Sequence, residues 1–263
     1  MHLPLTKHHG LGNDFLVLLD LSATLDVDGD LARAVCNRTT GIGADGLIRA
    51  RLDPDGADVR MELWNSDGSV AELSGNGLRC LAQALVLSDT TSTSLKVATA
   101  RGTHALEVTG TDLPGVHEVE ADMGPVELEG KAKDWLLPGV VDAAFARIEN
   151  PHLVLLAPDP ATAPDLDTVG REANDAVEGG INVEMIRSDG DALILDVYER
   201  GAGRTQACGT GACAAAAVAR HWGLVGDRVI VRMPGGAAHV GLGDTVSLAG
   251  PIEAVARVEY PWP

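Results

Sequence analysis

Two short segments of the chain share one arrangement, in which a small polar residue precedes Gly-x-Gly and an apolar run. The segments are "VAELSGNGLRC" at 70–80 and "RTQACGTGACA" at 204–214. Four positions of the first match four of the second in order: Ser74, Gly75, Asn76 and Gly77 with Cys208, Gly209, Thr210 and Gly211. The apolar runs predict two helices that begin at these glycines, where the first backbone N–H groups have no partner inside the helix. Such helix starts bind anions, and glycine lets a carboxylate approach the backbone closely.

A side chain that directly precedes each helix would lie beside the bound carboxylate. At Cys208 we expect the helix terminus to lower the pKa of the thiol from about 8.5 toward neutrality, which suits a general base. Ser74 would occupy the matching place at the other helix. One proton-transfer group on each face of a carbon next to a carboxylate is what racemisation or epimerisation requires, with the carbanion stabilised by the helix N–H groups. The pattern predicts a two-base site that needs no cofactor and no metal.

The elements that would position these residues are short strands around two buried helices. Strand patterns alternate with turn signals in both halves of the chain, among them "DFLVLLD", "LKVATA", "INVEMIRS" and "RVIVRM". The two helical runs, roughly 75–88 and 209–222, are apolar or small on every side, which is typical of a fully buried helix. We therefore predict an α/β (α+β) fold of two pseudo-symmetric halves, each with a mixed, mostly antiparallel sheet wrapped around a central helix.

Turn chemistry suggests where the two halves meet. Pro114-Gly115 and Gly250-Pro251 are the best boundaries, because proline and glycine together favour turns. They predict a first half of residues 1–114 with 251–263, which carries Ser74. The second half would be residues 115–250 and would carry Cys208.

Composition limits the class of protein. The 263 residues are 45% hydrophobic but only 3% aromatic, which predicts an aliphatic core. A formal net charge of −18 argues against nucleic acid or an anionic membrane as a partner. Because neither a signal-peptide pattern nor an apolar run of membrane-spanning length is seen, we expect a cytoplasmic protein without a membrane partner.

The cysteines do not form a metal-binding or disulfide pattern. The chain has four, Cys36, Cys80, Cys208 and Cys213, and none of them forms a Cys-x-x-Cys pair. Disulfides are rare in a reducing compartment. We expect Cys208 to be reactive and the other three to be packing residues.

Several blocks of the sequence resemble the diaminopimelate epimerase family. In chain order they are "HGLGNDF" (9–15), "GIGADGL" (41–47), "NSDGSVAELSGNG" (65–77), "NPH" (150–152) and "ERGAGRTQACGTG" (199–211). Members of that family have two similar α/β halves, use no cofactor, interconvert LL- and meso-diaminopimelate for lysine and cell-wall synthesis, and are often homodimers. The resemblance implies an isomerase whose partner is the small amino acid diaminopimelate and which forms a homodimer.

The resemblance also implies roles for individual residues. Cys208 matches one of two catalytic cysteines, and Ser74 stands at the place of the other. The backbone at four positions matches the cradle for the carboxylate at the reacting carbon: Gly75, Asn76, Gly209 and Thr210. Six residues match the shell that holds the distal end of the substrate: Asn13, Asn65, Asn150, Asn182, Glu199 and Arg200. His152 matches a histidine near the catalytic thiol. Without the resemblance, we would interpret Asn13, Asn65 and Asn182 as turn or cap residues. Glu199–Arg200 would be a solvated pair, and His152 a buried, hydrogen-bonded side chain.

Three positions depart from the family pattern. Ser74 replaces a cysteine, Arg204 stands where the family has glutamate, and Glu149 stands where it has glycine. A hydroxyl is a poor base without a neighbour that accepts its proton, although it can donate a proton to a carbanion. Ser74 is interpreted first as a natural variant that still epimerises, then as an introduced Cys→Ser substitution, and last as the sign of a different reaction.

Two other functions are compared with epimerisation of diaminopimelate. One is a racemase, epimerase or dehydratase of another amino acid, such as proline, on the same fold, for which Arg200 is the discriminating residue. The other is a binding protein that is inactive because Ser74 replaces a cysteine. Exchange of the substrate α-hydrogen with heavy water distinguishes an enzyme from a binder.

Overall fold

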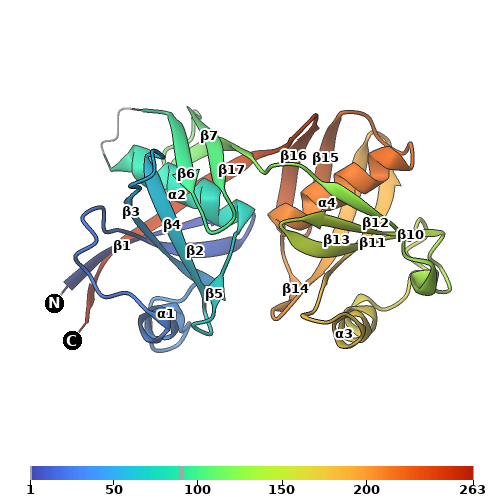
Figure 1. The fold of residues 1–263 in the computed structure, drawn as a ribbon, viewed down its shortest axis with the longest axis horizontal. Coiled ribbons are helices and arrows are strands. Elements are labelled where there is room, and N and C mark those ends of the chain that lie inside the picture. The colour runs from blue at the N-terminus through green and yellow to red at the C-terminus, as the bar shows by residue number, and fades with distance from the viewer. Residues whose placement is uncertain (1, 89–91, 263) are drawn as a thin grey trace. The chain divides into compact units, whose positions relative to one another are not determined.

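The computed structural model describes residues 2–88 and 92–262. Contacts between residues divide the chain into two compact units. The first consists of Met1–Ala121 with Gly250–Pro263, and the second of Asp122–Ala249. In each unit strands surround a helix (Figure 1).

Strands and helices follow one another in the same order from β1 to β7 in the first unit and from β10 to β16 in the second. The first unit contains β1 (His2–Gly10), β2 (Asn13–Leu19), α1 (Gly29–Cys36), β3 (Gly46–Leu52), β4 (Val59–Asn65), β5 (Val70–Ala71), α2 (Gly75–Leu87), β6 (Ser94–Ala98), β7 (Thr103–Gly110) and β8 (Val116–Asp122). The second contains β9 (Glu127–Lys131), the 3-10 helix η1 (Lys133–Trp135), β10 (Asp142–Ile148), β11 (Asn150–Leu156), α3 (Leu166–Ala176), β12 (Asn182–Asp189), β13 (Ala192–Glu199), β14 (Gly203–Thr205), α4 (Gly209–His221), β15 (Arg228–Met233) and β16 (Gly236–Leu242). The last strand, β17 (Val246–Pro261), begins in the second unit and ends in the first.

The strands of the first unit close into a ring. β1 pairs with β2, β2 with β3, β3 with β4, β4 with β6, β6 with β7 and β7 with β8. β17 pairs with both β8 and β1 and so completes the ring. The helix inside it is α2, which contacts β1, β2, β3 and β7.

The second unit repeats this pattern of pairing. The parallel pair β2–β3 corresponds to β11–β12, the antiparallel pair β3–β4 to β12–β13, and the parallel pair β4–β6 to β13–β15. Its central helix is α4, which contacts β10, β11, β12, β13, β15 and β16. The predicted fold class, two similar halves with a mostly antiparallel sheet around a central helix, is confirmed.

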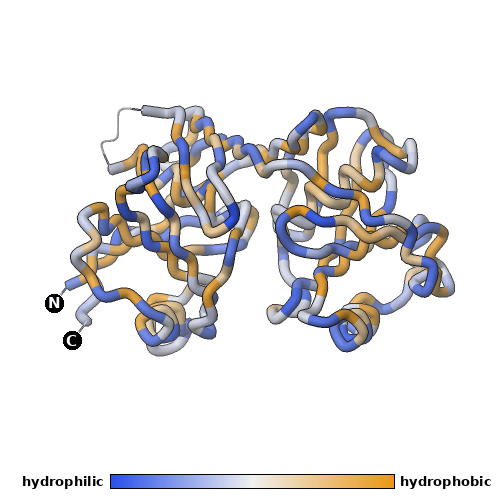
Figure 2. The backbone as a smooth tube through the Cα atoms, in the orientation of Figure 1, coloured by the Kyte–Doolittle hydropathy of each residue, from blue (hydrophilic) through white to orange (hydrophobic). Residues whose placement is uncertain are grey.

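Burial distinguishes the two central helices from the two outer ones. Every residue from Gly75 to Leu85 of α2 and from Gly209 to Ala216 of α4 is buried. The outer helices α1 and α3 bury one face only, as amphipathic helices do. Figure 2 shows hydrophobic and hydrophilic stretches alternating along the backbone, and most of the buried hydrophobic residues are aliphatic, as expected. No helix in the described part of the chain is long and apolar enough to cross a membrane.

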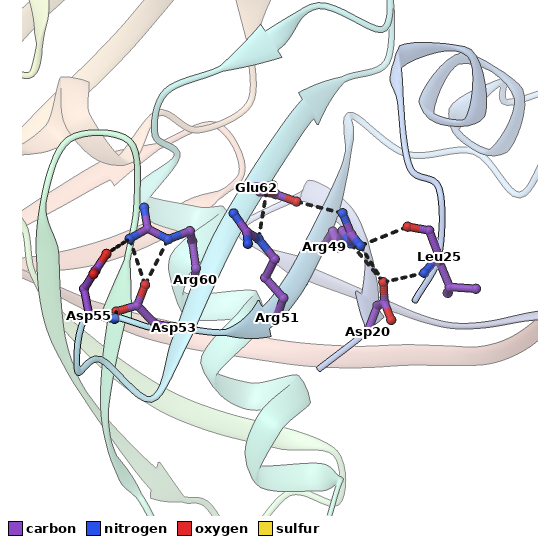
Figure 3. A network of polar contacts seen from close by, with 8 residues as sticks. All are labelled: Asp20, Leu25, Arg49, Arg51, Asp53, Asp55, Arg60 and Glu62. Carbon is purple, nitrogen blue, oxygen red and sulfur yellow. Dashed lines mark hydrogen bonds and ion pairs between the residues drawn. The ribbon is translucent and has the colours of Figure 1, made fainter. Parts of the chain in front are cut away.

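A polar network joins β3 and β4 of the first unit (Figure 3). Arg49 bonds Asp20 at 2.7 Å and Glu62 at 3.2 Å, and Arg51 bonds the same Glu62 at 3.0 Å. Arg49 and Glu62 lie directly opposite each other in the antiparallel register. Opposite charges at such cross-strand positions stabilise strand pairing.

Candidate active site

Ser74 is the N-cap residue of α2. Its backbone is extended, with φ −140° and ψ 122°, and its Oγ accepts a hydrogen bond from the Gly77 N–H at 3.0 Å. A short polar side chain is favoured here because it satisfies one of the unpaired N–H groups of the first turn. A Cβ on Gly77 would lie 3.1 Å from the Ser74 Cβ and 3.3 Å from Ile48 Cδ1, so glycine permits this close packing.

Cys208 is the N-cap residue of α4 and has the same local structure. Its φ and ψ are −127° and 117°, and its Sγ accepts a hydrogen bond from the Gly211 N–H at 3.3 Å. The hydroxyl of Thr210 lies 3.5 Å from the same sulfur. The two Gly-x-Gly segments therefore place a proton-carrying atom at the same point of each central helix.

We predicted that the helix terminus would lower the pKa of the Cys208 thiol, and this prediction is wrong. Burial raises the pKa of this thiol well above its usual value, and the carboxylates of Glu199 and Glu184 raise it further. Hydrogen bonds from the Thr210 hydroxyl and the Gly211 N–H act in the opposite direction. The helix terminus favours the thiolate, but the loss of solvation and the two nearby carboxylates outweigh it.

Glu199, at the end of β13, interacts with this thiol. Its Oε1 accepts a hydrogen bond from the Thr205 hydroxyl at 2.5 Å. Burial raises the pKa of the Glu199 carboxyl, while hydrogen bonds from Thr205 and Cys208 act against that increase. A carboxylate with a raised affinity for protons, placed beside a thiol, can accept the proton of that thiol.

The remaining cysteines are also buried. Burial raises the pKa of Cys36 and of Cys80 to about 12. Cys213 lies on the second turn of α4 and is buried as well. None of these three precedes a helix in the way Cys208 does, which fits packing roles for them.

His152, on β11, forms a buried pair with Glu184 on β12. The His152 Nδ1 lies 2.7 Å from Glu184 Oε1, and both side chains are 0% exposed. The His152 Nε2 lies 3.0 Å from Asn150 Oδ1. The Glu184 carboxyl also packs against the first turn of α4, because a Cβ on Gly211 would lie 2.7 Å from its Oε1. The start of α4 is thus the common neighbourhood of four predicted site residues: Asn150, His152, Glu199 and Cys208.

In the first unit the structure brings together Asn13 and Asn76. The Asn76 Nδ2 donates to Asn13 Oδ1 at 3.1 Å, and Asn13 Nδ2 donates to Asp45 Oδ2 at 2.8 Å. Asn65 lies apart from this chain of hydrogen bonds. It is exposed at the end of β4, where its side chain donates to the Ser69 hydroxyl at 3.0 Å within a turn.

In the second unit Asn182 and Arg200 are joined through the backbone. The Asn182 Oδ1 accepts a hydrogen bond from the Arg200 backbone N–H at 2.8 Å, which ties the start of β12 to the turn after β13. The Arg200 guanidinium is exposed and donates to the Gly179 carbonyl at 3.1 Å. The exposed guanidinium has further N–H groups with which it can hold a carboxylate.

Two of the departures from the family pattern have a structural account. Glu149 has φ 62°, a left-handed conformation that favours glycine, in the tight connection between β10 and β11. Arg204 is exposed on β14, where it lies 3.3 Å from Asp196 and 3.8 Å from Asp167. Glu149 thus occupies a backbone position suited to glycine, and Arg204 makes surface ion pairs.

Glu184 and Thr205 belong to this region and were not predicted from the sequence. Glu184 follows Asn182 by two residues in "INVEMIRS", so the two side chains lie on the same face of the strand. A glutamate at a position of the strand where the side chain is expected to be buried is unusual, and this signal could have identified Glu184. Thr205 gives no such signal, because its bond to Glu199 depends on the pairing of β13 with β14.

Sequence comparisons identify relatives that align with the whole chain. The matching family model is Diaminopimelate epimerase, over residues 5–129 and 145–247. A diaminopimelate epimerase of Erythrobacter litoralis (strain HTCC2594) is 37% identical over 280 residues, covering 100% of this chain and 98% of the relative. One of Microcystis aeruginosa (strain NIES-843 / IAM M-2473) is 35% identical over 293 residues, covering 99% of this chain and 100% of the relative.

Solved structures share the fold at lower identity. A predicted epimerase from Pseudomonas aeruginosa superposes with a TM-score of 0.78 at 18% identity. The match covers 99% of this chain and 100% of that structure. At this identity the likeness supports the fold.

Proposed function

The chain belongs to the diaminopimelate epimerase family, and from this membership we propose how its own residues carry out the reaction. The enzyme is an isomerase that converts LL- to meso-diaminopimelate, and the known role of the family is in the lysine pathway. The observation that carries the proposal is the matched pair of helix starts, with Ser74 and Cys208 at the same point of each.

The carboxylate next to the reacting carbon is bound by backbone N–H groups. Those of Gly75 and Asn76 at the start of α2, and of Gly209 and Thr210 at the start of α4, carry the partial positive charge of a helix terminus. The same groups stabilise the negative charge that develops on the carboxylate when the α-proton leaves.

The proton is exchanged by Cys208 on one face of the carbon and by Ser74 on the other. Because burial favours the neutral thiol, Cys208 acts as a base only when its own proton moves to an acceptor. Glu199 is that acceptor, since it interacts with Cys208 and its pKa is raised. Ser74 serves its face mainly as a proton donor, because a hydroxyl is a weak base.

The distal end of the substrate carries an ammonium group and a carboxylate. We assign the distal carboxylate to Arg200, whose guanidinium can make a bidentate pair. Asn13, Asn65, Asn150, Asn182 and Glu199 complete this shell as the family resemblance implies. His152 has a supporting role beside Asn150.

Exchange of the α-hydrogen tests the proposal directly. LL- and meso-diaminopimelate are incubated separately with the enzyme in heavy water, and deuterium uptake is followed by mass spectrometry together with chiral chromatography. The wild-type chain should incorporate deuterium and interconvert the isomers, and Cys208→Ala should do neither. Binding of diaminopimelate without exchange would identify a binding protein instead. Exchange with proline but not with diaminopimelate would identify a racemase of another amino acid.

We further propose that the enzyme is a cytoplasmic homodimer, as the family resemblance implies. Support for self-association comes from the first unit, where a cavity of about 510 Å³ is lined by β1, β2, β17 and the end of α2. Its lining is mostly apolar and includes Val255, which is 54% exposed, and contiguous exposed apolar surface is a feature of interaction sites. Light scattering should give twice the chain mass of 27.3 kDa, and the mass of a single chain would contradict the proposal.

A further inference from the structure

Glu184, in a buried pair with His152, is a charged residue of the second unit that the reaction scheme leaves unused. β11 and β12 are parallel, with His152 opposite Asn182 and Glu184 two residues further along. The Glu184 carboxyl therefore lies between the imidazole, 2.7 Å away, and the first turn of α4 at Gly211. The carboxyl thus lies close both to His152 and to the helix turn that Cys208 caps.

The first unit has apolar residues at the matching place. β2 and β3 are also parallel, with Phe15 opposite Gly46 and Ile48 two residues further along. Ile48 packs against the first turn of α2, because a Cβ on Gly77 would lie 3.3 Å from its Cδ1. Phe15 and Ile48 are thus the counterparts of His152 and Glu184, so this fold does not require a charged pair here.

The pair is also a poor choice for stability alone. Taking an imidazole and a carboxyl out of water has a desolvation cost that their attraction often fails to offset. Within the described part of the chain, the second carboxyl oxygen, Glu184 Oε2, is buried and accepts no hydrogen bond. A buried pair that is kept where its counterpart is apolar indicates a role in the chemistry.

We propose that Glu184 is a positioning residue that acts through His152. Its carboxylate accepts the Nδ1–H of the imidazole, and the Asn150 Oδ1 accepts the Nε2–H. Nε2 points to Asn150, which belongs to the proposed substrate shell, so this inference rests on the proposed function. An imidazolium, with a hydrogen on each nitrogen, satisfies both acceptors, and the Glu184 carboxylate stabilises its charge. This charge lies near Glu199, the group that accepts the Cys208 proton, and so favours the carboxylate form of Glu199 that the transfer requires.

Glu184→Gln separates this role from a packing role. Glutamine keeps the shape and the hydrogen-bond acceptor for Nδ1 but removes the charge that stabilises the imidazolium. Loss of such a supporting group lowers activity by about 10- to 100-fold. We expect kcat for diaminopimelate to fall in this range, with KM changed less than about twofold and the melting temperature unchanged. Glu184→Asp, which keeps the charge, should recover part of kcat.

A double variant transfers the apolar pair of the first unit into the second. His152→Phe with Glu184→Ile should fold with an unchanged or higher melting temperature, because apolar replacement of a buried ion pair is often neutral or stabilising. It should lose epimerisation. Glu62→Gln removes a carboxylate from a strand of the first unit and is the matched control, with kcat expected to stay at the wild-type value.

The outcomes distinguish this inference from the proposed function. Wild-type kcat in Glu184→Gln would overturn the role of Glu184 while the wild-type chain still epimerises diaminopimelate. A fall in kcat that follows a fall in melting temperature, without recovery in Glu184→Asp, would show a structural role and overturn it too. A wild-type chain that does not exchange the α-hydrogen of diaminopimelate would instead overturn the proposed function.

Discussion

Cys208 shows how the neighbours of a residue decide its chemistry. Burial and two carboxylates raise the pKa of its thiol, so the resting side chain carries its proton at neutral pH. The thiolate fraction grows only as the pH rises toward that higher pKa. The reaction therefore depends on a local acceptor, and the contact of Cys208 with Glu199 provides one.

Replacement of Glu199 by Gln should change labelling and turnover in opposite directions. Removing a carboxylate that raises the pKa of the Cys208 thiol should speed its alkylation by iodoacetamide at about pH 8, because more thiolate is present. The same replacement removes the proton acceptor and should lower kcat by about 100-fold or more. Mass spectrometry of the Cys208 adduct and a diaminopimelate assay measure the two effects. A decrease in both rates would contradict the assignment of Glu199.

Arg200→Met should weaken recognition of the distal carboxylate. Hydrogen bonds between charged groups are worth about 1.5–3 kcal/mol, so kcat/KM for diaminopimelate should fall by roughly 10- to 100-fold, mostly through KM. Arg200→Lys keeps the charge but loses the bidentate geometry. Its kcat/KM should lie between the values of the wild-type chain and of Arg200→Met. Steady-state kinetics checks this. Unchanged turnover in Arg200→Met would show that the substrate is not anchored through Arg200 and would favour another amino acid.

Glu149 has a backbone conformation that suits glycine. At φ 62° a side chain with a Cβ is strained by about 1–2 kcal/mol relative to the right-handed region. Glu149→Gly should therefore be more stable to urea than Glu149→Ala, by about 1 kcal/mol. Alanine is the matched control because both variants lose the carboxylate while only alanine keeps the strained Cβ. Equal stability of the two would show that this connection relaxes.

At the scale of elements, local patterns predicted more than long-range pairing. The two helices begin at Gly75 and Gly209 as predicted, because a polar cap, Gly-x-Gly and an apolar run act within one turn. The sequence predicted that residues 251–263 return to the first half, but not that they close a ring of strands, because the pairing of β17 with β1 joins the two ends of the chain. The link between Asn13 and Asn76 was hidden for the same reason, since it joins β2 to α2.

The N-cap of α2 gives a test at this scale. Ser74→Ala removes the hydroxyl that accepts the Gly77 N–H, and should lower the free energy of unfolding of the first unit by about 1 kcal/mol. Ser74→Asp keeps a capping oxygen and should lose little. Urea unfolding of both variants measures the difference. Equal stability of alanine and aspartate would show that the cap contributes nothing.

At the scale of the whole molecule, the chain repeats one device with different chemistry in each unit. Cys208 has Glu199 as a partner and lies near the pair of His152 and Glu184, whereas the first unit has Phe15 and Ile48 at the place of that pair. Both starts of the central helices could be predicted from local sequence. The raised pKa of Cys208 could not, because it results from burial of the thiol and from carboxylates on β12 and β13, and only the fold brings these about.

Unequal chemistry predicts unequal exchange. The diaminopimelate isomer whose α-hydrogen faces Cys208 should exchange readily in heavy water, and the isomer whose α-hydrogen faces Ser74 much more slowly, because the hydroxyl is a weak base. Ser74→Cys should make the two rates similar and raise overall epimerisation. Mass spectrometry of each isomer with both chains checks this. Equal exchange in the wild-type chain would show that Ser74 is activated by a neighbour, and no gain in Ser74→Cys would indicate a different reaction.

The path of β17 has a consequence for how the protein is made. Its early residues pair with β16 in the second unit, and its late residues pair with β1, the first strand of the chain. During synthesis the ribosome produces the whole second unit before the strand that closes the first ring. Domains usually fold in the order in which they leave the ribosome. Here the edge of β1 stays unpaired until the second unit has been translated. A nascent chain stalled before residue 250 would therefore expose this strand edge, and exposed edges promote aggregation.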